Sequence, residues 1–163
     1  MLITFPAISW WNCSTFFLNR LESLARDTVL TRFVTSSGSM KKQAKPRAKP
    51  RVFIPNDKVK PGLFELSTYL IDGLSDRGVW NIGTINIEPL IDRLIPARCD
   101  LPTKEYEAHG LIAEFDNIPE RHVNILNWTA ESESQQSIAL ELVAAVDKQE
   151  GFHDNPAYEN RAK

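Results

Sequence analysis

An apolar stripe near the C-terminal end of the chain constrains the fold most strongly. The stripe consists of Ile138, Ala139, Leu142, Val143 and Val146, which recur at helical spacing. Ser132, followed by Gln135, forms a capping-box pattern that predicts the start of a helix, with Thr129 as the alternative cap. A helix with one apolar face is stable only when another layer covers that face. The sequence therefore predicts a long helix that packs against a sheet.

Short segments rich in strand-forming residues would supply that sheet. Residues 111–115 and 122–128 are predicted to pair as an antiparallel hairpin across the turn 116–120. Residues 66–71 alternate like a strand, although the leucines of 62–74 also fit a helix. A glycine follows the run, which favours the strand.

Three further segments carry helix signals. Ser75 is a good N-cap for a helix that would stop at Gly83. Asp100 can cap a helix over 101–109. Residues 84–96 fit either a strand or a short helix, so both structures stay open there.

We therefore expect an α+β fold: one small domain over residues 51–148, with a short mixed or antiparallel sheet, packing helices and a first strand at Arg51–Ile54. Residues 149–163 are expected to form a disordered tail. Residues 40–50 are expected to form an extended basic arm that contains prolines. Residues 1–39 are expected to lie outside the domain as a disordered extension.

Met40 opens the run MKKQAKPRAKPR, which is typical of an ordinary N-terminus. Our hypothesis is that Met40 is the natural start and that residues 1–39 are read-through of upstream sequence; the alternative is a genuine extension. Residues 1–19 carry no charge, but polar residues and a proline interrupt them, and a membrane span needs about 20 mainly apolar residues. We expect neither a secretory signal nor a membrane partner.

Charge is distributed unevenly along the chain. The formal net charge is −2, yet residues 40–60 carry eight basic side chains and one acidic one, while residues 61–163 carry eight basic and eighteen acidic ones. An acidic body therefore follows a basic segment. The two cysteines, Cys13 and Cys99, make no disulfide framework, so we expect a reducing, cytoplasmic location.

The basic arm is a candidate polyanion-binding segment. Its candidate residues are Lys41, Lys42, Lys45, Arg47, Lys49 and Arg51. Several phosphate contacts from such an arm would make nucleic-acid binding depend steeply on salt. The alternative is a solubilising arm that contacts the body's own carboxylates.

The stretch 121–128 is a candidate recognition surface formed by Arg121, His122, Asn124 and Trp128. On a strand, His122 and Asn124 would share one face, because successive side chains alternate. Arg121 would offer donors for a phosphate or carboxylate, and Trp128 a plane for stacking. The alternative is structural: His122 and Asn124 satisfy loop carbonyls and Trp128 caps the core.

Several sequence pieces resemble a family of short, uncharacterised bacterial proteins. The pieces are Ile71-Asp72-Gly73-Leu74-Ser75, Val79-Trp80-x-Ile82-Gly83, Ala97-Arg98-x-Asp100-Leu101, Gly110-Leu111 and Asp116-Asn117-x-Pro119-x-Arg121-His122-x-Asn124-Ile125 with Trp128. The resemblance covers about residues 51–147. The family has Gly and Pro on either side of the tryptophan, where this chain has Asn127 and Thr129. The resemblance implies a cytoplasmic bacterial protein and brings no activity with it.

Residue patterns for common enzyme chemistry are missing from the sequence. Cys99 and His122 could form a thiolate–imidazole pair, but no third residue would orient the histidine. No histidine or cysteine spacing fits a metal site, and no glycine loop fits a nucleotide, so we expect neither metal nor cofactor. We therefore expect a non-enzymatic accessory or protein-interaction module. The alternative is a nucleic-acid-binding accessory protein that uses the basic arm.

Overall fold

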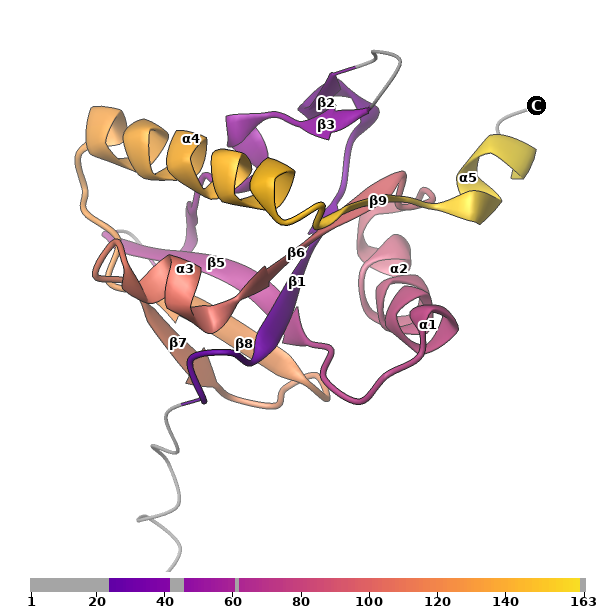
Figure 1. Ribbon diagram of the computed structural model, residues 1–163, viewed down its shortest axis with the longest axis horizontal. Helices are drawn as coiled ribbons and strands as arrows, with labels where there is room; N and C mark the ends of the chain where they lie inside the picture. The colour runs from indigo at the N-terminus through magenta and orange to yellow at the C-terminus, as the bar shows by residue number, and fades with distance from the viewer. Residues whose placement is uncertain (1–23, 42–45, 61, 162–163) are drawn as a thin grey trace, which may run out of the picture.

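An antiparallel sheet forms the centre of the computed structural model, which describes residues 24–41, 46–60 and 62–161 (Figure 1). Seven strands of this described chain take part: β1 (Val29–Val34), β4 (Asn56–Lys60), β5 (Leu63–Leu70), β6 (Ala97–Pro102), β7 (Ile112–Phe115), β8 (His122–Leu126) and β9 (Phe152–Asp154). Their order is β7-β8-β5-β1-β6-β9, with β4 paired to the first residues of β5. Every pairing is antiparallel.

Helices and a small hairpin surround this sheet. The helices are α1 (Asp76–Asn86), α2 (Glu88–Ile91), α3 (Thr103–Glu107), α4 (Ser132–Lys148) and α5 (Pro156–Arg161). The 3-10 turns are η1 (Ser37–Ser39) and η2 (Pro50–Val52). The hairpin consists of β2 (Met40–Lys41) and β3 (Arg47–Ala48). The predicted α+β class and single small domain are confirmed.

One face of the sheet, the α4 face, carries the larger core. Side chains at alternate strand positions, such as Leu30 and Leu66, point to this face and pack with Leu142 and Val146 of α4. The chain thus buries the apolar stripe as predicted, because the strands present a matching apolar surface.

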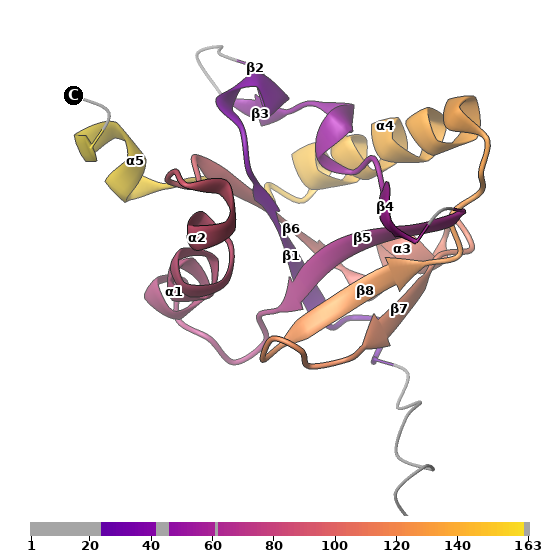
Figure 2. The same cartoon turned by 180° about the vertical axis from the view of Figure 1, so that it is seen from behind.

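The opposite face, the α1 face, carries a smaller core. Phe33 of β1 and Tyr69 of β5 pack there with Val79 of α1 and with Ile95. Gly83 lets α1 come close, since a Cβ at that position would lie 2.9 Å from the Phe33 ring. Helices α1 and α2 cover only part of this face: Figure 2 shows β7, β8 and the first part of β5 with no described helix in front of them.

The expectation that residues 1–39 lie outside the domain is wrong for the residues that the structure describes there. Strand β1 lies between β5 and β6, with Leu30 paired to both Leu70 and Leu101. Leu30 and Val34 are buried. A start at Met40 would remove this strand and split the sheet. Strand β1 is buried on both faces and therefore lacks the polar–apolar alternation that reveals a half-buried strand. Residues 1–23 lie outside the described chain.

The expectation of a disordered tail from residue 149 is also wrong. Strand β9 pairs with β6, and Asn155 donates a hydrogen bond from Nδ2 to the backbone oxygen of Ile95 at 2.7 Å. Gly151 makes the approach possible, because a Cβ there would lie 2.2 Å from the backbone oxygen of Asp100. Pro156 is the first residue of α5, so the chain stays ordered beyond β9.

Local sequence signals identified three features of the fold correctly. The hairpin of β7 and β8, the strand β5 and the cap at Ser75, whose side chain accepts from the Gly78 amide, are confirmed. Helix α1 continues past Gly83, and α2 forms in the region that we had left open. Arg51–Ile54 is not a strand, because η2 takes up Arg51 and Val52 and no strand is assigned to the two residues that follow.

Two predicted helix caps are wrong. Asp100 lies within β6, and Pro102 occupies the N-cap of the short helix α3. Helix α4 has Glu131 at its N-cap without a side-chain cap bond, and Gln135 donates from Nε2 to the Thr129 oxygen at 2.6 Å instead of closing a capping box.

Candidate functional site

The turn between β7 and β8 fixes the predicted stretch around Arg121. Asn117 and Arg121 both adopt positive φ values, 55° and 66°. The Arg121 amide donates to Asn117 Oδ1 at 2.7 Å, and Arg121 Nη1 donates to the backbone oxygens of Leu70 and Asp72 at 3.3 Å each. The guanidinium thus ties the hairpin to the end of β5, and one of its amino groups is already engaged by backbone.

Asp116 organises the two polar residues that follow. Its Oδ1 lies 2.8 Å from His122 Nδ1, and its Oδ2 accepts from Asn124 Nδ2 at 3.0 Å. A carboxylate oxygen accepts, so the His122 contact requires a proton on Nδ1. His122 and Asn124 do share a strand face, but their partner is this carboxylate rather than the loop carbonyls that we had considered.

A row of polar side chains crosses the α1 face from His122. His122 pairs with Tyr69, Tyr69 with Thr31, and Thr31 with Asp100, each as direct cross-strand neighbours. The rings of Tyr69 and His122 are edge to face, with centroids 5.3 Å apart. We call His122, Tyr69, Thr31 and Asp100 the polar row.

An ion-pair cluster extends the polar row at Asp100. Asp100 Oδ2 lies 3.2 Å from both Arg98 Nε and His153 Nε2. Arg98 Nη2 also lies 2.8 Å from Asp76 Oδ1, and its guanidinium carbon lies 4.8 Å from the centre of the Trp80 ring. Arg98 therefore joins α1 to β6 by charge and by stacking.

The polar row is packed rather than open to a substrate. Thr31, Tyr69 and His122 are buried, and none of the cavities described below is lined by a residue of the row. Burial raises the pKa of the Tyr69 hydroxyl, which therefore keeps its proton. Thr31 Oγ1 and Asp100 Oδ1 find no hydrogen-bond partner among the described residues. This arrangement can hold the hairpin and α1 in place.

Trp128 does not join the other three candidate residues. It is buried in the core of the α4 face, and its Nε1 donates to the Ile125 backbone oxygen at 3.0 Å. Asn127, just before the tryptophan, adopts a φ of 68° and donates from Nδ2 to the Gly110 oxygen at 2.7 Å. Asparagine tolerates this conformation, so the turn forms without glycine. Cys99 also belongs to the α4-face core, away from His122 on the opposite face.

The described part of the basic arm, residues 40–41 and 46–50, is folded against the body instead of extended. Arg47 Nη1 lies 3.2 Å from Asp147 Oδ2 of α4, and Lys49 Nζ donates to the Gly38 backbone oxygen at 2.8 Å. Lys41 is exposed on β2, and Arg51 is exposed on η2. The remaining two candidates, Lys42 and Lys45, lie outside the described residues.

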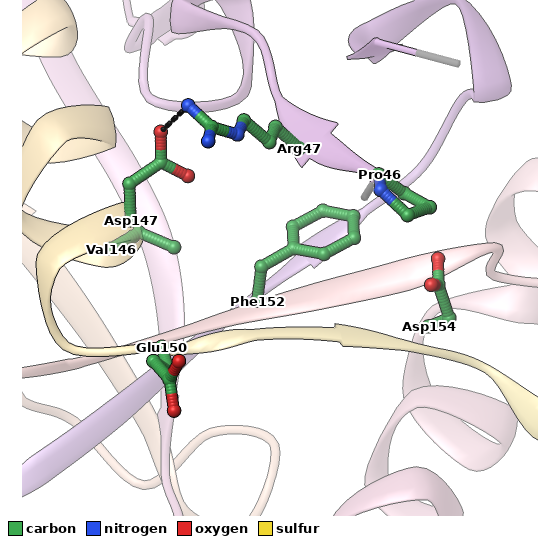
Figure 3. A pocket seen from close by; sticks show the side chains of 7 residues that line it. All are labelled: Pro46, Arg47, Val146, Asp147, Glu150, Phe152 and Asp154. Atoms are coloured by element: carbon green, nitrogen blue, oxygen red, sulfur yellow. Dashed lines mark hydrogen bonds and ion pairs between the residues drawn. The ribbon is translucent and has the colours of Figure 1, made fainter. Parts of the chain in front are cut away.

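Two of the cavities lie beside this folded arm. One, of about 290 Å³, is shown in Figure 3: the Phe152 ring lies between Arg47 with its partner Asp147 and the pair Pro46 and Asp154. The second, of about 350 Å³, is a shallow groove lined by Pro50, Arg51, Ile54, Gln136 and Leu140. No group of three or more His, Cys, Asp or Glu side chains that could hold a metal occurs in the described chain.

Our sequence interpretation missed three contributors to this region. Asp116 was assigned only to a turn, Asp100 to a helix cap, and His153 to a disordered tail. The two-residue spacing of Arg98 and Asp100 was a usable signal, since on a strand it places both side chains on one face. The contribution of His153 depends on the β6–β9 pairing, which no local pattern indicates.

Comparisons with known proteins add no assignment: the chain matches no protein-family model, no curated protein and no solved structure. Within the described residues, no helix has the length and apolar character required to cross a membrane.

Proposed function

We propose that this protein is a non-enzymatic protein-interaction module that binds its partner through the hairpin of β7 and β8. The observation that carries the proposal is the apolar edge of this hairpin. Ile112 is 56% exposed, Phe115 40% and Ile118 77%, and β7 is an edge strand with β8 as its sheet neighbour. Edge strands with exposed apolar side chains are templates for a further strand, and proteins usually blunt them.

An extended segment of another protein fits this edge best. Such a segment can add a strand to β7 by main-chain hydrogen bonds and seat alternate side chains on the apolar residues. Glu114 on β7 and Glu120 in the turn supply negative charge, in keeping with the acidic character of residues 61–163. We therefore propose a partner segment that is apolar and basic.

The candidate site residues contribute by holding the hairpin rigid. Asp116 binds both His122 and Asn124, and Arg121 fastens the turn to β5. A surface that is ordered before binding loses less conformational entropy when the partner arrives. This role explains why a stretch so dense in polar side chains faces inward.

Cellular location is part of the same proposal. Cys99 is a free, buried thiol. Thiols persist in a reducing compartment such as the cytoplasm.

A nucleic-acid-binding role for the basic arm has less support. Arg47 already faces Asp147, and Lys49 is engaged by a backbone oxygen. Fewer phosphate contacts would then remain for a polyanion, and the salt dependence of binding would be shallower.

Capture of partners on the tagged full chain tests the proposal. The hairpin variant carries Ile112→Asp and Ile118→Asp. The control carries Ile85→Asp and Leu90→Asp. Ile85 on α1 is 71% exposed and Leu90 on α2 is 81% exposed, so the control adds the same charge and removes a similar apolar surface as the hairpin variant does. We expect a specific protein to be retained by the wild type and the control, and at least about tenfold less by the hairpin variant.

Two outcomes would overturn the proposal. In one, the hairpin variant and the control retain the same protein equally. In the other, the captured material is nucleic acid that is released by nuclease and by salt, which would favour the basic arm.

A further inference from the structure

A third cavity lies at the end of β1 that leads into η1. It measures about 220 Å³, is partly open to solvent, and is lined by residues of β1, η1, η2 and the segment after α2. Its lining residues are Arg32, Phe33, Val34, Thr35, Ser36, Ser39, Arg51, Val52 and Arg93. Three of these side chains are guanidinium groups and three are hydroxyls, and none is a carboxylate. The lining thus combines positive charge with hydrogen-bond donors.

Arg32 is the deepest of the three arginines. It is partly buried, with Nε donating to the Val52 oxygen at 3.2 Å and Nη1 donating to the Ser67 oxygen at 2.8 Å. Both acceptors are neutral carbonyls. No carboxylate lies within ion-pair distance of Arg32 in the described part of the chain. Burial lowers the pKa of the Arg32 guanidinium, because loss of water disfavours its charged form.

A partly desolvated charge without a counterion is costly, so proteins usually pair it. Arg32 stays protonated at neutral pH, since arginine does not lose its proton in proteins. Its two carbonyl contacts hold the guanidinium in a fixed orientation, and Nη2 makes no hydrogen bond to the described residues. That amino group is the one left for a ligand.

Arg51 and Arg93 line the same cavity from two separate elements. Both are exposed, one on η2 and the other directly after Asp92, which has a φ of 50°. Neither has a carboxylate partner among the described residues, although Asp92 lies next to Arg93 in sequence. Because the side chains of these two arginines are exposed, they can change rotamer and contact a ligand that Arg32 binds.

The hydroxyls complete the donor set. Ser36 Oγ accepts from the Gly38 amide at 3.3 Å, which leaves its own hydrogen free to donate, and Ser39 is buried beside it. Oxyanions take several such donors at once, and guanidinium groups match phosphate geometry with paired bonds.

We propose that this cavity is a binding site for a phosphate group, either as free phosphate or as a small phosphate monoester. The size agrees with this class, since a cavity of about 220 Å³ has room for a phosphate with a small substituent. It is smaller than the roughly 300–1,000 Å³ of pockets for larger ligands. The site is separate from the β7–β8 hairpin and does not depend on the proposed partner.

Calorimetric titration and thermal unfolding of the full chain test this site. The probes are inorganic phosphate and glycerol phosphate, with sodium chloride keeping the ionic strength constant. The test variant is Arg51→Gln with Arg93→Gln, because both side chains are exposed and their loss leaves the core intact. The control is Arg77→Gln with Lys148→Gln, which removes the same charge from exposed residues that do not line the cavity.

We expect both probes to bind and to raise the melting temperature of the wild type and the control. The test variant should bind at least about tenfold more weakly, since it loses two charge-assisted contacts. Preference for one probe distinguishes free phosphate from a monoester. The proposal fails if neither probe binds the wild type, or if test and control variants bind equally.

Arg32→Lys gives an independent measurement. The lysine keeps the positive charge but cannot reach both carbonyls and the ligand with one ammonium group. We expect weaker phosphate binding in a variant whose circular dichroism spectrum matches that of the wild type. Unchanged affinity in such a folded variant would remove Arg32 from the site.

Discussion

The carboxylate of Asp116 determines the role of the polar residues in the stretch 121–128. Its two oxygens engage His122 and Asn124, so these side chains support the turn instead of facing a ligand. The sequence stretch correctly indicated a strand and a shared face. It did not indicate the partner, because the carboxylate of a turn aspartate can accept from many alternative donors, including backbone amides of its own turn.

Cys99 provides a pH prediction at the same scale. Its ordinary pKa is 9.0, and burial raises the pKa of the Cys99 thiol far above that value in the folded chain. Above pH 9 the unfolded chain releases this proton while the folded chain keeps it. The contribution of this thiol to the free energy of unfolding should therefore be fully present below pH 9. Above pH 9 that contribution should fall by up to about 1.4 kcal/mol per pH unit.

Urea unfolding under reducing conditions between pH 7 and pH 10 measures this effect. In Cys99→Ala the contribution of the thiol disappears, so its free energy of unfolding should decline less steeply above pH 9 than that of the wild type. Other groups that titrate in this range act on both proteins. Parallel curves would show that the thiol is not protected by burial.

At the scale of elements, short connections decide where the C-terminal segment lies. Gly151 allows the chain to pass close to β6, and its backbone oxygen accepts from the Asp100 amide at 2.8 Å. Its amide donates to the Val146 oxygen at 2.9 Å. One glycine thus joins the end of α4 to the β6–β9 pairing.

Gly151→Ala should destabilise the fold by about 1–3 kcal/mol, because the added methyl group overlaps the Asp100 backbone oxygen and forces β9 away from β6. Urea unfolding measures the loss, and faster hydrogen exchange in Phe152–Asp154 should accompany it. The matched control is Gly78→Ala, where the nearest contact of a new Cβ is 3.5 Å. Equal stability of the two variants would contradict this account.

Elements with strong local signals were predictable, and those fixed by distant partners were not. The stripe of α4 and the Ser75 cap of α1 depend on residues within one or two turns, and both were identified. Strands β1 and β9 acquire their structure from β6, which is remote in sequence from β1 and separated from β9 by two helices and two strands. Local patterns could not report such pairings.

At the scale of the whole molecule, the central position of β1 is the main departure from the sequence interpretation. The proline-rich basic run after Met40 looked like the beginning of the chain, yet it connects η1 to η2 beside α4. The fold class was predictable because it depends on the count and kind of elements. The strand order was not, since it depends on how distant strands pair.

A chain that starts at Met40 should therefore fail to fold cooperatively. It lacks Leu30, Phe33 and Val34, all buried, and losing large core side chains costs about 2–5 kcal/mol each. That total reaches the roughly 5–15 kcal/mol by which domains are stable. Near-ultraviolet circular dichroism and urea unfolding should show no cooperative transition.

A chain that starts at Leu24 is the control, because it keeps every described element. It should unfold in one transition. A chain from Met40 with the same midpoint would restore the hypothesis that the natural start is there.

The sheet order has a consequence for biosynthesis. Strand β1 leaves the ribosome first, yet its two neighbours, β5 and β6, are translated much later. Until residue 70 has been added, β1 has no partner strand, and until residue 102 has been added its second edge stays open. Chaperones at the ribosome would therefore bind β1 early in synthesis. In the folded protein this strand lies in the middle of the sheet.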